Sequence, residues 1–587
     1  MSEYDWNLKE IFKNKEEFNI MKKGLEEDLE NISKYQGILC ENSNNLYSCY
    51  KLFEKALEKY EKLYGYGMLY YNLDMSNQEG IKLYKEVEAI GTNFSTKTAF
   101  MTPEITYADS KEIEKYLKED KRLEPYKRDI LDILEEKEHI LSKEEENILA
   151  NYGEVFSAPE NTFEVLTNAE FKFGNLIDEN GKEQELTESN YTIYLKSKKE
   201  EVRKQAFNLM YDKYKEFINT ITELYLSNVK KTTITANLRK YKSSLDMATK
   251  NDDSNLKVYE TLINTINEKI SVNHKFIKLK KEILKNKEFH MYDLYVNPFE
   301  QGKDEITYEE AKEEVINALS IMGDEYVNKL KEAFTNNWID VYAKPHKRGG
   351  AYSMGIYGVH PFVLLNFVNS KRDISTIAHE LGHSIHSYYS NSNQNIINAD
   401  YTIMTAEVAS TVNEILLSNY QIENEKDIEK KKELLYELLE MIRATLFRQS
   451  MFAEFEKTIH EKVENVENLS CEDLNKIYYE LNKKYFGNDI IVDEKIQYEW
   501  ARIPHFYSDF YVYKYATGIS SAISIANKII KNGTPYIEKY INMLKQGRSK
   551  KSIDLLKMVD VDLETKEVYE DAINFYNEKI KELEELI

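Results

Sequence analysis

Apolar side chains recur at helical spacing along most of this chain, and few residues interrupt the pattern. Between Met21 and Ile32, apolar residues follow one another at intervals of 4, 4 and 3 positions, with charged residues between them. The 587 residues include only 8 prolines and 20 glycines, the residue types that most often end helices. We therefore expect a mainly α-helical protein built from long helices.

The segment His379-Glu380-Leu381-Gly382-His383 predicts a metal site. In a helix, residues four positions apart lie on one face, so both imidazoles can reach a single Zn²⁺. Glu380 would stand beside them and accept a proton from a zinc-activated water, as a general base does. Either Asp373 or Ser375 can cap this helix, which we expect to cover residues 374–389.

A catalytic zinc site needs a third protein ligand and one position left for water. In one zinc-peptidase pattern a third histidine lies ten residues after the first, but Tyr389 occupies that position here. Glu407, on a second segment of apolar, helix-forming composition, is the predicted third ligand. A ligand role for His386 is a less favoured alternative. Side chains that can orient the ligands by hydrogen bonding are His386, Ser410, Thr411 and Glu414.

An apolar and β-branched run, Phe362–Val368, precedes the motif and predicts a buried strand. Together with Trp338–Tyr342 and a turn at Lys347–Gly350, it predicts a small sheet beside the metal. The small residues after this turn would let a peptide backbone pair with an exposed strand edge, although a plain hairpin loop is an equal alternative. The candidate substrate-binding residues are Gly350, Ala351 and Tyr352.

These and several further stretches resemble oligoendopeptidase F, the bacterial branch of the thimet oligopeptidase family of zinc metallopeptidases. The stretches that carry the resemblance are His379–Tyr389, Ala406–Thr411, Ile503–Gly518, Gly350–Ser353, His290–Tyr295, Ile442–Phe455 and Tyr241–Asp246. The resemblance covers about residues 160–587 and is most specific in the second half of the chain. The first 110 residues resemble the family only in length and helical character.

The resemblance implies a mainly α, two-lobed zincin-type metallopeptidase with a small β-sheet beside a deep active-site channel. It also implies that one Zn²⁺ per chain serves to cut internal bonds of short, unstructured peptides. His505 and a following tyrosine would contact the substrate and the oxyanion, and a phenol hydroxyl is a suitable donor for that oxyanion. The candidate tyrosines are Tyr507, Tyr511 and Tyr513. The alternative is that Tyr507, Tyr511 and Tyr515 form a buried aromatic stripe.

Length and composition limit the remaining possibilities. We expect an N-terminal helical region at 1–110, an intermediate segment at 111–190 and a catalytic region at 191–587. A formal charge of −23 without a basic stripe argues against a nucleic-acid partner. Three scattered cysteines predict neither a disulfide framework nor a thiolate metal site. Because neither a signal peptide nor an apolar run of spanning length is visible, we expect a cytoplasmic protein without a membrane partner.

The leading hypothesis is a zinc-dependent endopeptidase that acts on oligopeptides. Two alternatives use the same scaffold: a peptide-binding protein without catalytic activity, and a zinc carboxypeptidase. The intact general base and the complete ligand set favour the endopeptidase. The same ligands also accept Co²⁺ or Mn²⁺, and nothing in the sequence specifies an oligomeric state.

Overall fold

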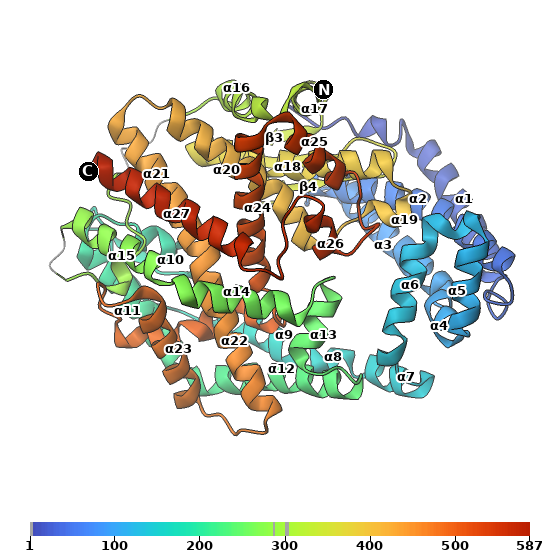
Figure 1. The fold of residues 1–587 in the computed structure, drawn as a ribbon, viewed down its shortest axis with the longest axis horizontal. Helices are drawn as coiled ribbons and strands as arrows, with labels where there is room; N and C mark the ends of the chain where they lie inside the picture. The colour runs from blue at the N-terminus through green and yellow to red at the C-terminus, as the bar shows by residue number, and fades with distance from the viewer. Residues whose placement is uncertain (1–3, 286–287, 300–304) are drawn as a thin grey trace. The chain divides into compact units, whose positions relative to one another are not determined.

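The computed structural model describes residues 4–285, 288–299 and 305–587, and helices dominate these ranges (Figure 1). The chain divides into two compact units, each assembled from three separate stretches. Unit 1 comprises Met1–Glu138, Lys303–Tyr420 and Ile525–Val561, and unit 2 comprises His139–Gly302, Gln421–Ser524 and Asp562–Ile587. This division is by spatial contact, so the boundaries at 110 and 190 stay a prediction about segments along the chain.

Unit 1 contains the N-terminal helices and the helices around a small sheet. Its helices are α1 (Lys15–Ser33), α2 (Ser43–Leu73), α3 (Gln78–Thr98), α4 (Met101–Tyr107), α5 (Ser110–Glu119), α6 (Lys127–Glu135), α16 (Tyr308–Ala318), α17 (Asp324–Thr335), α18 (Lys371–Asn393), α19 (Ile396–Ala399), α25 (Thr534–Leu544) and α26 (Ser552–Lys557). The predicted apolar stripe is confirmed in α1, where Leu25, Leu29 and Ile32 are fully buried in the core of this unit.

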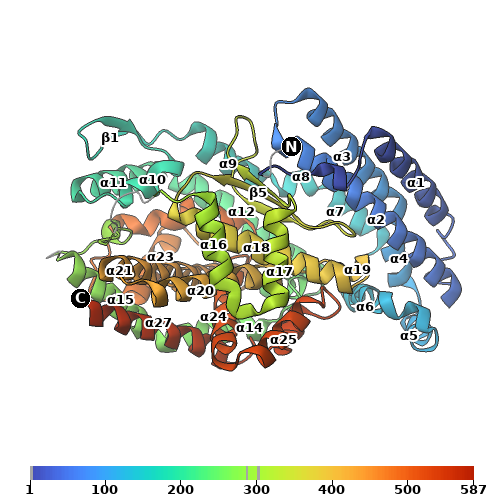
Figure 2. The ribbon, with the colours of Figure 1, turned by 90° about the horizontal axis from the view of Figure 1, so that it is seen from above.

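The sheet of unit 1 has three strands in the order β3-β5-β4, with β3 (Ile339–Tyr342), β4 (Tyr352–Met354) and β5 (Phe362–Phe367). β5 pairs parallel with β3 and antiparallel with β4, in the register Ser353 opposite Val363. α18 packs against both β4 and β5, so the predicted strand and sheet lie directly beside the helix of the histidine motif (Figure 2).

Unit 2 is almost entirely helical. Its helices are α7 (Lys143–Asn151), α8 (Gly153–Phe156), α9 (Ala158–Val165), α10 (Glu188–Leu195), α11 (Glu200–Glu216), α12 (Ile218–Leu238), α13 (Ser244–Asn251), α14 (Leu256–Lys269), α15 (Ser271–Leu284), α21 (Ile428–Ile442), α22 (Gln449–Glu464), α23 (Cys471–Phe486) and α27 (Glu567–Leu586). A two-stranded hairpin joins β1 (Asn175–Ile177) to β2 (Glu183–Glu185). Two further helices have residues in both units: α20 (Ile403–Asn424) and α24 (Tyr513–Asn532).

Candidate metal and catalytic site

The helix that carries the histidine motif begins earlier and ends later than the sequence predicts. Its N-cap is Ser370, and Asp373 accepts a hydrogen bond from the Ser370 amide at 2.8 Å, forming a capping box. The prediction that Asp373 or Ser375 is the cap is therefore wrong, because the carboxylate of Asp373 reaches back to the true cap. Ser375 instead donates its hydroxyl to Glu414 at 3.0 Å.

Gly382, inside the motif, sets how closely the two ligand-bearing helices approach. A Cβ at this position would lie 2.6 Å from the Cα of Ser410 and 2.8 Å from the backbone oxygen of Ala409. Only glycine leaves room for such a backbone contact within regular helices. As a result, α20 crosses α18 closely enough for Glu407 to reach the histidines. The predicted loop between the two helices contains a further short helix, α19.

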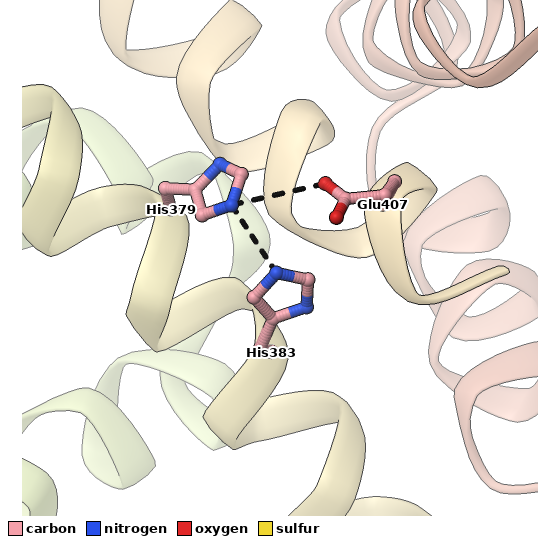
Figure 3. Close-up of side chains that lie close together, drawn as sticks. All are labelled: His379, His383 and Glu407. Carbon is pink, nitrogen blue, oxygen red and sulfur yellow. Dashed lines mark hydrogen bonds and ion pairs between the residues drawn. The ribbon is translucent and has the colours of Figure 1, made fainter. Parts of the chain in front are cut away.

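Three side chains converge from these two helices (Figure 3). The Nε2 atoms of His379 and His383 are 3.2 Å apart, and the Glu407 carboxylate oxygen lies 3.8 Å from the Nε2 of His379. Among the residues that the structure describes, these three form the one group of His, Cys, Asp or Glu suited to hold a metal, with ligand atoms within 4.8 Å of one another. His386 is not part of this group.

The two separations measured from His379 fit a tetrahedral zinc ion. Two ligand atoms about 2.0–2.1 Å from such an ion lie about 3.3 Å apart. The observed separations of 3.2 and 3.8 Å bracket that value. Two imidazoles and one carboxylate also form the donor set of catalytic zinc sites with an open fourth position. The residues present therefore fit Zn²⁺.

Further hydrogen bonds orient the histidines. The Nδ1 of His379 lies 2.6 Å from a Glu414 oxygen, which leaves the Nε2 of that ring directed at the other ligands. Burial lowers the pKa of His379, but the hydrogen bond and charge of Glu414, with the charges of Glu380 and Glu407, raise it to about 9. Burial lowers the pKa of His383 to about 3, against a hydrogen bond with the backbone of Ala406.

Of the other predicted orienting residues, Ser410 contacts a metal ligand directly. Ser410 donates its hydroxyl to the Glu407 backbone oxygen at 3.0 Å and lies 3.3 Å from the Glu407 carboxylate. Thr411 is half-buried on α20. His386 is buried, and its ring stacks on Tyr401 with a centroid distance of 3.7 Å. The hydroxyl of Tyr401 in turn lies 3.4 Å from the backbone oxygen of His383.

Glu380 is buried beside the cluster, with 6% of its surface exposed. Burial raises its pKa to about 7, helped by the charges of Glu407 and Glu414, while the charge of His379 and a hydrogen bond from the Ser353 backbone lower it. A carboxyl group with a pKa near neutrality is suited to exchange protons. Sequence reasoning missed the contact with Ser353, because it depends on the register of β4 against β5.

β4 presents an edge beside this glutamate. β5 pairs with one side of β4 only, and the hydrogen bond to Glu380 directs the Ser353 amide away from β5. Gly350 has a left-handed φ of 82°, and a Cβ there would meet nothing within 4 Å. The hydroxyl of Tyr352 accepts a hydrogen bond from Asn72 at 2.7 Å. The three candidate substrate-binding residues thus lie on or next to a strand at the edge of its sheet, as far as the described residues show, with open space at Gly350.

Lys347 anchors the loop that precedes β4. Its ammonium group is fully buried and donates to an Asp340 carboxylate oxygen at 2.6 Å. It also donates to the backbone oxygens of Asp340 and Tyr342, at 3.1 and 2.8 Å. A buried charge with all its partners in place holds this loop in one conformation.

His505 and its tyrosines belong to unit 2. His505 lies in a short 3-10 turn, Pro504–Tyr507, and is exposed. Its Nε2 lies 3.3 Å from the hydroxyl of Tyr515, and its ring stacks on Tyr511 at 5.9 Å between centroids. Tyr511 and Tyr515 are half-buried. Tyr515 belongs to this cluster although it was not among the three candidates.

The other two candidate tyrosines lie in the core of unit 2. Tyr513 is fully buried and its hydroxyl donates to Asp252 at 3.2 Å. Tyr507 is 5% exposed and stacks on Phe163 at 4.6 Å between centroids. The aromatic-stripe interpretation therefore describes the environment of Tyr507, whereas Tyr511 and Tyr515 line the surface around His505.

Comparison with known proteins agrees with this site. Residues 193–575 match Peptidase family M3, and residues 104–173 match a segment described as Oligopeptidase F. The chain belongs to peptidase family M3. It is a zinc metallo-oligoendopeptidase of the oligopeptidase F type, and the two alternative hypotheses are set aside.

Similar proteins cover the whole length of this M3 peptidase. Oligopeptidase PepF of Bacillus subtilis is 39% identical over 100% of this chain and 88% of its own. The crystal structure of a Chlamydophila abortus protein, 33% identical, aligns over 100% of this chain and 99% of that chain with a TM-score of 0.93. Oligoendopeptidase-F of Enterococcus faecium, 31% identical, covers 97% of this chain and 99% of its own with a TM-score of 0.74. Within the described ranges, no helix combines the length and apolar character needed to cross a bilayer.

Proposed function

We propose that His379, His383 and Glu407 bind one Zn²⁺ per chain and that Glu380 is the general base of peptide hydrolysis. The observation that carries this proposal is the convergence of the three ligand atoms within 4.8 Å, with the buried Glu380 carboxyl beside them. Zinc held there would supply Lewis-acid polarisation of the scissile carbonyl and of the attacking water.

Glu380 would move the proton. As a carboxylate it accepts a proton from the attacking water, and as the acid it returns that proton to the leaving amine. Its pKa of about 7 suits both directions near neutral pH. The Ser353 amide limits the orientations that the carboxyl group can adopt, because it donates to that group from the neighbouring strand.

The substrate would bind as an extended strand along the free edge of β4. Gly350, Ala351 and Tyr352 then offer backbone groups and close approach, and the edge lies next to Glu380. Pairing of this kind requires an extended peptide, so the substrates are short and unstructured. The deep channel implied by the family resemblance leads to the same restriction and stays a prediction.

His505 and Tyr511 are the proposed donors to the oxyanion. Although the residue is exposed, partial desolvation of its ring by the surrounding protein and the charge of Arg448 lower the pKa of His505, which favours the neutral imidazole that can donate one N–H. Tyr511 is the preferred tyrosine because its ring stacks on His505 and it is half-buried. The hydroxyl of Tyr513 already has a partner in the core.

The test is the nearly isosteric substitution Glu380→Gln. Zinc content, measured on the purified protein, should stay at one ion per chain, while kcat on an end-blocked fluorogenic peptide should fall by about 10²–10⁴ or more. A variant that keeps more than about a tenth of the wild-type kcat would contradict the general-base role. Loss of zinc would instead place Glu380 among the ligands.

We also propose that the enzyme works in the cytoplasm and acts on peptides without a nucleic-acid or membrane partner. Cys40, Cys49 and Cys471 are free thiols, as expected in a reducing compartment. Fractionation of cells followed by an activity assay tests this location.

A further inference from the structure

The segment between His505 and Tyr511 has an unusual backbone. Asp509 and Phe510 have positive φ angles of 20° and 58°. In this region the Cβ of a bulky residue approaches its own backbone, so a phenylalanine rarely adopts the conformation. Such a conformation persists only where the surroundings impose it, and it occurs most often at functional sites.

Glu456 of α22 contacts the backbone of Phe510. Its carboxyl oxygen accepts a hydrogen bond from the Phe510 amide at 2.6 Å. The side chain of Glu456 is 0% exposed, and within the described part of the chain its second oxygen has no hydrogen-bond partner. Burial raises the pKa of Glu456 well above its ordinary value, although the hydrogen bond from the Phe510 amide acts in the opposite direction.

α12 holds the same segment from another side. Thr232 donates its hydroxyl to one Asp509 oxygen at 2.7 Å, and the Asn228 amide lies 3.1 Å from the other. The Phe510 ring packs on His460 at 4.4 Å between centroids. The turn is therefore held through its backbone by Glu456 and through both of its side chains.

We propose that Glu456 is a positioning residue for His505 and Tyr511. This inference rests on the proposed role of these two residues as oxyanion donors. Among the described residues no hydrogen bond joins Glu456 to either of them, but its bond to the Phe510 amide sets the backbone that joins them. If that bond is lost, the amide loses its buried partner and Phe510 can leave the left-handed region. His505 and Tyr511 would then lose their mutual alignment.

The chemistry of Glu456 predicts different results for three substitutions. Glu456→Gln keeps a side-chain oxygen of the same reach that can accept the hydrogen bond of the Phe510 amide, and kcat should stay within about threefold of wild type. Glu456→Leu removes the acceptor, and Glu456→Asp retracts it by one methylene group. Both should lower kcat by about 10- to 100-fold, because small displacements of catalytic groups have effects of this size. Zinc content and KM should change little.

A matched control separates positioning from general destabilisation. Ile277 is fully buried on α15, another helix of the same unit, and does not belong to the segment. Ile277→Ala should lower the Tm without the loss of kcat at temperatures well below the transition. If Glu456→Leu does not fold, Glu456→Asp is compared with Glu456→Gln, and only Glu456→Asp should lose kcat. Wild-type kcat in both variants would overturn the proposal.

A double substitution shows whether Glu456 acts through Tyr511. Tyr511→Phe alone tests the oxyanion role, and in that background Glu456→Asp should cost far less than it costs in the wild type. Full additivity, or a loss no larger than that of the control, would overturn the positioning role. If Tyr511→Phe alone has wild-type kcat, it is the proposed role of Tyr511 that fails. In that case Glu456→Asp is combined with His505→Ala instead, and full additivity of these two substitutions would overturn the positioning role.

Discussion

The metal ligands of unit 1 and the His505 segment of unit 2 are built in opposite ways. His379, His383 and Glu407 project from the regular turns of two long helices. His505 lies in a short 3-10 turn, and a left-handed pair of residues separates it from Tyr511. Regular helices place ligands by periodicity, whereas the second segment keeps its conformation through contacts with distant residues. The two regions should therefore respond differently to substitution.

The largest effect is expected at the ligands themselves. Glu407→Ala should remove most of the bound zinc and lower kcat/KM by about 10⁴-fold or more, because the metal accounts for several kcal/mol of transition-state stabilisation. Metal content and activity measured on the same preparation check this. Near-wild-type zinc in this variant would mean that the third ligand lies elsewhere.

A smaller effect that leaves zinc in place is expected in the His505 segment. His505→Ala and Tyr511→Phe should each lower kcat by about 10²–10³, as is typical for loss of an oxyanion donor. The core tyrosines serve as controls, and Tyr507→Phe and Tyr513→Phe should stay within about threefold. Steady-state kinetics on one end-blocked peptide compares all four. Equal losses of kcat in Tyr511→Phe and Tyr513→Phe would mean that burial does not separate the oxyanion donor from the core tyrosines.

Gly382 tests whether the regular helices also depend on a tertiary contact. Gly382→Ala places a Cβ against the backbone of α20, so the free energy of unfolding should fall by about 1–3 kcal/mol. Because Glu407 moves with α20, zinc affinity should weaken roughly tenfold or more. Chelator competition measures the affinity, with Ala378→Gly as a control in the same helix. Unchanged zinc affinity would mean that α20 adjusts without moving its ligand.

The smallest effect on kcat is expected at the loop before β4. Lys347→Met removes the buried ammonium partner of Asp340 and leaves only Lys344, 3.3 Å from the same carboxylate, so the free energy of unfolding should fall by about 1.5–3 kcal/mol. A displaced substrate edge should raise KM while kcat stays within about threefold. Restoring neutrality with Asp340→Asn in the same chain should recover part of the stability. An unchanged KM would separate this loop from substrate binding.

The predictable part of the site follows from local rules. Helical spacing alone aligns His379 with His383, and the apolar run after the turn predicts β5 because a buried strand needs such residues. Glu407 was predictable because it is a carboxylate residue within a second segment of apolar, helix-forming composition. The helix start at Ser370 was missed, since Asp373 looks like a cap until its backward hydrogen bond is known.

What the sequence determined by itself is therefore the helical class and the His-His-Glu group, and it predicts the general base, because each follows from residue type and short-range periodicity. The tertiary structure decided the rest. Ser353 reaches Glu380 only through the register of β4, and Tyr511 differs from Tyr513 in its burial, since Tyr511 is half-buried beside His505 and Tyr513 is buried against Asp252. The backbone of Phe510, between His505 and Tyr511, is hydrogen-bonded to Glu456, 54 residues away along the chain, and local patterns carry no information about contacts of such sequence separation.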